Sequence, residues 1–117
     1  MDTEIISEPI PMSELAAMAS PEFFNAVKAV VDIEREVMAV GGELHADQEV
    51  LLLDQGSAQN DLWGINLYPG KTGGEFIEYD SMINLRPSFG NRSRGIDDPE
   101  TRRRVADVVH RLVKADE

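Results

Sequence analysis

Alternating polar and apolar positions predict an antiparallel sheet in the second half of the chain. Residues 62–68 alternate well enough to form one strand, which Pro69 and Gly70 would end. Residues 75–86 supply a partner strand after the glycine-containing turn at 71–74. The two segments together predict a hairpin at the centre of a small sheet.

Apolar residues at helical spacing predict two longer helices. The last one, at 98–114, carries an apolar stripe made of Val105, Val108, Val109, Leu112 and Val113. The other, at 47–55, would begin after Asp47 as its cap and end before Gly56. Its apolar residues cover more than half of its circumference, so we expect it to be deeply buried or to lie between two surfaces.

The segment 27–42 fits two structures. Its apolar residues recur at helical spacing after Ser20-Pro21-Glu22, a typical helix start, so one helix over 21–40 is tenable. Its five valines and an isoleucine favour a strand instead, with the charged run 32–36 as the bend of a hairpin. Periodicity alone does not separate the two.

The N-terminal residues 1–20 are predicted to be a separate small segment. Ile5 and Ile6 fit a short strand, Pro9 would end it, and Ser13 would cap a short helix. Residues 21–117 then form a single domain of the α+β class: a small antiparallel sheet with the helices on one face, including a hairpin at 27–42. The element order raises the possibility of two ββα units.

Composition excludes several classes of protein. The chain has no cysteine, which rules out disulfides, thiolate catalysis and zinc held by thiolates. No apolar run is long enough to cross a membrane, and the first residues do not resemble a signal peptide, so we expect a cytoplasmic protein. The net charge of −11 argues against binding to nucleic acid or to an anionic membrane.

The charges are unevenly distributed along the chain. Residues 1–60 carry 12 acidic and 2 basic side chains, whereas 61–117 carry 10 acidic and 9 basic ones, mostly arginine. One interpretation is that a basic C-terminal surface packs against the acidic N-terminal half, within the chain or in a homo-oligomer. The other is an anion site, since arginine pairs well with carboxylate and phosphate. Arg92, Arg94 and Arg102–Arg104 would be the contacts for nucleic acid, which the overall charge disfavours.

The loop 86–95 is the first candidate binding site. Polar residues gathered where a strand runs into a glycine-containing loop commonly form sites. We expect Asp80 and Asn84 to share one face of the strand with Met82 and Arg86. Replacing Arg92 and Arg94 together with alanine should leave the melting temperature within a few degrees. The candidate ligand-binding residues are Asp80, Asn84, Arg86, Asn91, Arg92 and Arg94.

A second candidate is a divalent metal site at Glu43, His45 and Asp47. If this segment is extended, the three side chains project to one side, and imidazole with carboxylates suits zinc, manganese or iron. The alternative is structural: Asp47 caps a helix and His45 bonds to a turn. No motif identifies any other cofactor.

Five sequence blocks resemble a known protein family. They are 30–35, 41–47, 62–69, 80–87 and 90–95, and the similarity extends over nearly the whole chain, including 5–11. The chain is similar to the family known as domain of unknown function 5674. The resemblance implies a bacterial protein and implies no activity, substrate or catalytic residue.

Three classes of function fit these patterns. The first is a small non-enzymatic interaction or regulatory module that associates with itself or a protein partner, because the charge is asymmetric and no catalytic motif is present. The alternative is a small hydrolase that binds an anion or a metal through His45, its neighbouring carboxylates and the loop 86–94. Nucleic-acid binding is the third and is disfavoured by charge.

Overall fold

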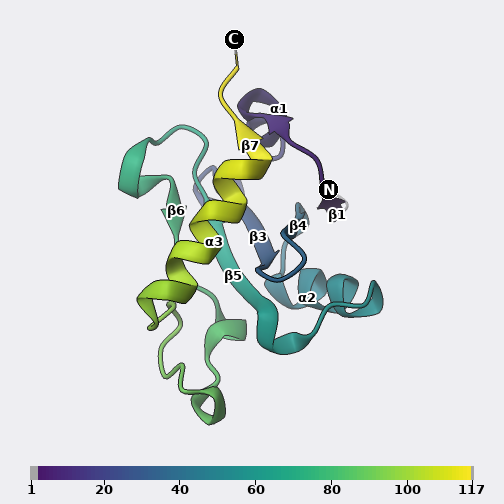
Figure 1. Cartoon of the computed structure of the whole chain (residues 1–117). Helices are drawn as coiled ribbons and strands as arrows, with labels where there is room; N and C mark the ends of the chain where they lie inside the picture. Colours follow the sequence, from purple (N-terminus) through teal and green to yellow (C-terminus); the bar gives the residue numbers. More distant parts are fainter. Residues whose placement is uncertain (1–2, 117) are drawn as a thin grey trace.

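The computed structural model describes residues 3–116 and contains one five-stranded sheet with helices against it (Figure 1). The strand order is β1-β4-β3-β5-β6, and every neighbouring pair is antiparallel. The strands are β1 (Glu4–Ile6), β4 (Val37–Val40), β3 (Val27–Asp32), β5 (Leu62–Leu67) and β6 (Ile77–Glu78). The α+β class and the antiparallel sheet predicted from the sequence are confirmed.

Segments near the two ends of the described chain pair in a second, smaller sheet. Strand β2 (Ile10–Pro11) pairs in parallel with β7 (Val113–Lys114), next to the short helix α1 (Met12–Ala16). The predicted cap of that helix is wrong: Pro11 occupies the cap position, and Ser13 instead bonds to Asp116. None of the helices between residues 3 and 116 is both long and apolar enough to cross a membrane.

The segment 27–42 is a hairpin, which decides between the two structures that its sequence allowed. Strands β3 and β4 pair with Val31 opposite Met38. Their turn has no glycine; the buried carboxylate of Asp32 accepts hydrogen bonds from the amides of Glu34 and Arg35, and Glu36 takes the left-handed conformation. The Asp32 side chain thus bonds to two amides of the turn and stabilises a bend that usually contains glycine.

Helix α3 (Pro99–Leu112) covers one face of the sheet and forms the main core. Asp98 caps it by accepting from the amide of Thr101, and the predicted apolar stripe is buried. This stripe packs with alternate residues of the strands, such as Val31 and Ile65. The helix ends two residues earlier than predicted, because Val113 and Lys114 enter β7.

Helix α2 (His45–Asp54) lies on the opposite face, so the prediction that the helices share one face is wrong. Its Leu52 packs with Val30, Ala39 and Leu62, which belong to a second apolar cluster. In Figure 1, α3 crosses in front of β3 and β5 while α2 lies behind them. Strand β3 is buried on both faces, so its sequence is almost continuously apolar and resembles that of a helix.

The predicted long strand at 75–86 is also wrong. Only Ile77–Glu78 pair with β5; a 3₁₀ helix η4 (Met82–Asn84) follows. The side-chain amide of Asn84 takes the place of the missing strand: it accepts from the Gly64 amide at 2.8 Å and donates to the Gly64 carbonyl at 2.9 Å. Asp80 and Asn84 therefore do not share a strand face with Met82 and Arg86.

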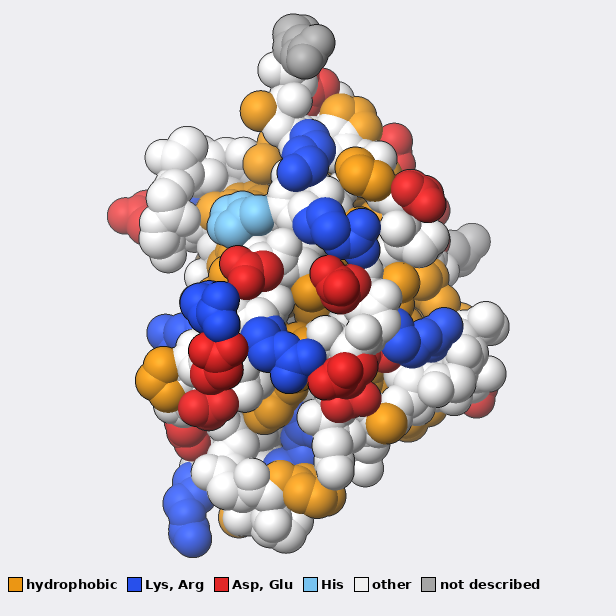
Figure 2. Space-filling view, in the orientation of Figure 1, with side chains coloured by type: hydrophobic (Ala, Val, Ile, Leu, Met, Phe, Trp, Pro, Cys, Tyr) orange, Lys and Arg blue, Asp and Glu red, His pale blue; other side chains and the backbone are white. Residues whose placement is uncertain are grey.

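Two ion pairs join the basic C-terminal helix to the acidic first half of the chain. Arg104 pairs with Glu34 at 2.8 Å and Arg111 with Glu36 at 3.6 Å, so α3 is tied to the turn of the hairpin. Figure 2 shows acidic and basic side chains interleaved over this face. The interpretation that the basic C-terminal surface packs against the acidic half is thus realised within one chain.

Candidate functional site

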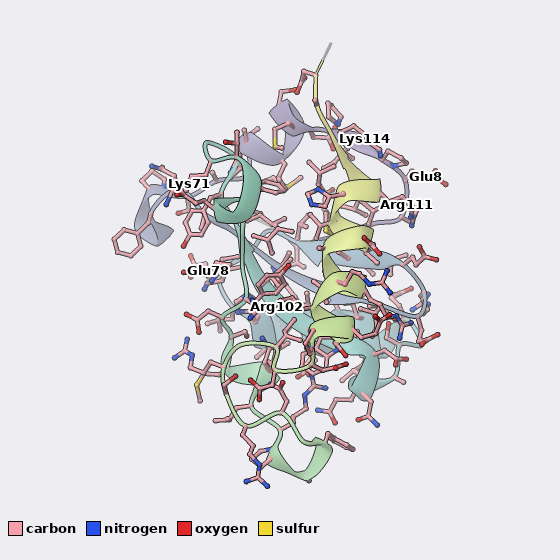
Figure 3. All side chains as sticks on the ribbon, turned by 60° about the vertical axis from the view of Figure 1, so that its left-hand side comes forward. Glu8, Lys71, Glu78, Arg102, Arg111 and Lys114 are labelled. Atoms are coloured by element: carbon pink, nitrogen blue, oxygen red, sulfur yellow. The ribbon has the colours of Figure 1, made fainter. Side chains whose placement is uncertain are left out.

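A row of polar side chains crosses the sheet on the α2 face. Lys28 lies opposite Asn66, and Asn66 lies opposite Glu78, in neighbouring strands. Residues two positions apart in a strand share a face, so Lys28 lies on the same side as Val30, which packs under α2. Figure 3 shows Glu78 projecting from β6 away from α3. Helix α2 begins at His45, next to this row, and does not cover all of it. The row is therefore partly open to solvent.

Two neighbouring cavities open over this row. The first, of about 340 Å³, is lined by Phe24, Lys28, Asn66, Tyr68, Glu78 and Asp80. The second, of about 230 Å³, is lined by Lys28, Glu43, His45, Ser81, Arg94 and the start of α2. Lys28 lines both, and an ion pair of 2.7 Å between Asp80 Oδ1 and Arg94 Nε joins one cavity to the other. Together they form the candidate site.

The orientation of the Asn66 amide follows from its partners. Its Nδ2 donates to Glu78 Oε1 at 2.9 Å and to the carbonyl of Asp80 at 3.3 Å; both are acceptors. The same Glu78 oxygen accepts from the Tyr68 hydroxyl at 2.9 Å. Desolvation, with this hydrogen bond as the next cause, raises the pKa of Tyr68. Asn66 Oδ1 is left without a hydrogen-bond partner, although the residue is only 8% exposed.

His45 lies at the start of α2 and forms the wall of the second cavity. Its Nε2 is 2.8 Å from the carbonyl oxygen of Ile65, which can only accept, so Nε2 carries the proton and Nδ1 does not. Burial, with smaller contributions from the nearby cations Lys28 and Arg94, lowers the pKa of His45 from 6.5 to about 4. The imidazole is therefore neutral at physiological pH.

The buried imidazole makes stability depend on pH. The unfolded chain binds a proton at His45 below about pH 6.5, while the folded chain does so only near pH 4, so stability falls as pH decreases between these values. The loss attributable to His45 is expected to reach about 3 kcal/mol. Urea unfolding at pH 7, 5.5 and 4 measures it. The variant His45→Gln, which has no titrating group there, should show a shallower decrease; equal decreases would contradict the lowered pKa.

Three of the predicted ligand-binding residues support the loop in the structure. Asn84 is fully buried against Gly64, and Asn91 Nδ2 donates to the carbonyls of Asn84, Ser93 and Gly95. Arg86 donates to the carbonyls of Gln59 and Leu62, and its guanidinium lies 4.4 Å from the centre of the Trp63 ring.

The other three predicted residues differ in their positions. Arg94 and Asp80 line the cavities and pair with each other. Arg92 is exposed, and its backbone amide, not its side chain, bonds to Asp97. Since an exposed ion pair contributes at most about 1 kcal/mol, removing Arg92 and Arg94 together remains predicted to change the melting temperature little.

The predicted metal ligands are not brought together. The segment is not extended, because α2 begins at His45 and not at Gln48, with Leu44 as its cap. Asp47 therefore lies inside the first turn and is not the cap, and Glu43 is exposed at the rim of the second cavity. Across residues 3–116, no three histidine, aspartate or glutamate side chains are grouped so that they could hold a metal ion.

Sequence reasoning missed Lys28, Asn66 and Glu78. A signal was present: Lys28 and Asn66 are isolated polar residues in strands that are otherwise nearly all apolar. An isolated polar residue in a buried strand indicates a place where the strand is not covered. That the two lie opposite each other depends on strand register, which the sequence does not reveal.

Comparison with known proteins identifies the family. No curated protein matches the chain, and no solved structure does. Residues 4–112 match one family, which covers nearly all of the sequence. The chain therefore belongs to the family described as "Protein of unknown function (DUF5674)".

Proposed function

We propose that this protein is a small non-enzymatic binding module, which takes a small polar ligand over the uncovered half of its sheet. The observation that carries this proposal is the polar row of Lys28, Asn66 and Glu78 beneath two cavities. A buried sheet face is normally filled with apolar side chains. Polar groups set on such a face, next to open space, suit a small polar ligand that bonds to them.

Binding is favoured over hydrolysis by the state of the possible catalytic groups. A general base should have a pKa near the working pH, whereas the pKa of His45 is about 4. The hydroxyl of Ser81 accepts from the amide of Ile83, and no histidine bonds to it. The geometry offers neither an activated nucleophile nor a metal ligand set within the described residues.

Backbone strain at the rim of the first cavity supports a role in binding. Phe24 takes the left-handed conformation, with φ of 59°, and the residue is 85% exposed. Both features cost free energy. The left-handed conformation is unfavourable for a residue other than glycine, and an exposed ring lacks the stabilisation that burial would give it. Strain of this kind tends to persist where a residue contacts a ligand.

Blocking the second cavity tests the proposal. Ala46 is exposed at the start of α2 and lines this cavity, so the variant Ala46→Trp should fill it without disturbing the core. A panel of amino acids, organic acids, sugars, amines and nucleotides is screened by thermal shift. We expect at least one compound to stabilise the wild-type protein and not Ala46→Trp. The matched control is Ala16→Trp, at an exposed position of α1. If no compound stabilises the wild type, the proposal is wrong.

Self-association is a second candidate and rests on a different surface. Exposed apolar side chains occur on α2, at Val50 and Leu53, and beside it at Met82 in η4 and at Leu85 just after η4. Apolar residues gathered on adjoining elements are typical of interfaces. Sedimentation over a range of protein concentrations tests this: a monomer at every concentration would exclude it, and a dimer should dissociate in Val50→Lys.

A further inference from the structure

We infer that the ligand is a small zwitterion, which places an anionic group in the second cavity and an ammonium group in the first. This inference rests on the proposed function and adds the chemical class of the ligand. It follows from which hydrogen-bonding atoms the chain leaves unused in each cavity.

Unused donors gather in the second cavity. Arg94 uses Nε for Asp80, and its two Nη atoms bond to no described residue. Leu44 at the cap of α2 cannot accept a hydrogen bond with its side chain, so the first amides of the helix remain available. These amides and the guanidinium both favour an anion.

A buried hydroxyl in the same cavity points to a ligand independently of the helix. Ser81 is 1% exposed, and its oxygen accepts from the Ile83 amide, but its proton has no acceptor among the described residues. A buried donor without an acceptor is costly. A carboxylate or phosphate oxygen in the cavity would supply that acceptor.

Unused acceptors gather in the first cavity. Glu78 uses only Oε1 and Asp80 only Oδ1, so each carboxylate has one oxygen without a hydrogen bond to a described residue. Acceptors with surplus negative charge suit an ammonium group, which carries three donors.

The charges of the two cavities are complementary to a zwitterion. The first has one cation, Lys28, and two carboxylates. The second has two cations, Arg94 and the shared Lys28, and one carboxylate, Glu43, beside the neutral His45. Because the cavities share Lys28 and are joined by the Asp80–Arg94 pair, one short molecule can reach both. Two sources share this chemistry: a free amino acid and a phosphorylated amine.

Calorimetric titration of the full chain distinguishes these ligands. The probes are glycine, β-alanine, γ-aminobutyrate and phosphoethanolamine, with acetate, inorganic phosphate and methylammonium as single-ended probes. We expect one zwitterion to bind at least about tenfold more tightly than either single-ended probe, because a charge-assisted contact is lost with each end. Tighter binding of phosphoethanolamine would indicate the phosphorylated source, and tighter binding of a carboxylate zwitterion the amino acid.

Two variants test the two ends separately. Arg94→Gln should weaken binding of the zwitterion at least about tenfold, and so should Glu78→Gln. The matched controls, Arg92→Gln and Glu75→Gln, change exposed residues that line neither cavity and should leave the affinity unchanged. Controls that weaken binding as much as the test variants would overturn the placement of the ligand.

The outcome also separates this inference from the proposed function. If the screen finds an uncharged or purely anionic ligand whose binding Ala46→Trp abolishes, the module binds ligands but the zwitterion is wrong. If no compound binds to the wild type, both are wrong. Equal affinity for the zwitterion and for one of its ends would overturn the inference alone.

Discussion

Asn84→Ala is expected to lower the free energy of unfolding by about 4 kcal/mol, because it leaves two buried main-chain groups of Gly64 without partners. The variant also removes the bond from Asn84 Nδ2 to the carbonyl of Arg94 at 2.9 Å. Each buried polar group without a partner costs about 1–3 kcal/mol. Urea unfolding followed by the fluorescence of the single tryptophan measures the change.

Hydrogen exchange gives a readout specific to this contact. The amide of Gly64 should be protected in the wild type and exchange much faster in Asn84→Ala, since it donates its hydrogen bond to the Asn84 side chain. Asn84→Asp should not rescue stability, because it places a carboxylate against two carbonyl oxygens. Asn60→Ala, at an exposed position, is the control. A loss below about 1 kcal/mol would show that the η4 segment is not held by this side chain.

Gly64→Ala is expected to cost about 3 kcal/mol or more, since a methyl group there has no room. Its Cβ would lie 2.6 Å from both Cβ and Oγ of Ser81, which is packed over β5. Either the strand or the η4 segment must move, and both carry groups of the candidate site. Thermal unfolding should show a decrease of roughly 10 °C for a domain of this size.

A double-mutant cycle identifies the cause of that loss. Ser81→Gly removes the two atoms closest to the new methyl group and leaves only Ile83 Cγ1 at 3.1 Å, so Gly64→Ala should cost much less in the Ser81→Gly background. Gly74→Ala is the matched control, because a Cβ at Gly74 meets no atom within 4 Å. Equal costs in both backgrounds would show that Ser81 does not cause the strain.

These two residues also connect the stability of the fold to the candidate site. The carbonyl of Arg94 accepts from the amide of Ser81 and from Asn84 Nδ2, both at 2.9 Å. The backbone that carries the Arg94 guanidinium is thus fixed by the same segment that covers Gly64. Any variant that releases η4 should therefore weaken ligand binding as well as stability.

Local signals in the sequence were sufficient for several elements. Ser20 and Asp98 accept hydrogen bonds as helix caps because a short polar side chain before a helical turn satisfies its free amides. The apolar stripe of α3 follows from its periodicity, since one face of the helix meets the sheet and the other meets water. Strand β5, predicted at 62–68, is found at Leu62–Leu67.

Other elements depend on contacts between distant residues. Strand β3 is buried from both sides by α3 and α2, so its sequence lost the alternation that marks a strand. Residues 79–86 have the composition of a strand, but the Asn84 amide bonds to Gly64 in place of a strand backbone. No short-range pattern contains that information.

The candidate site depends on register most of all. Lys28, Asn66 and Glu78 are separated by 38 and 12 positions in the chain, and only the pairing of β3, β5 and β6 aligns them. A shift of one residue in either pairing would move a side chain to the other face. The sequence alone therefore indicated the residue types available for binding and the α+β class. The tertiary structure decided which of those residues meet, because strand pairing joins parts of the chain that no local interaction connects.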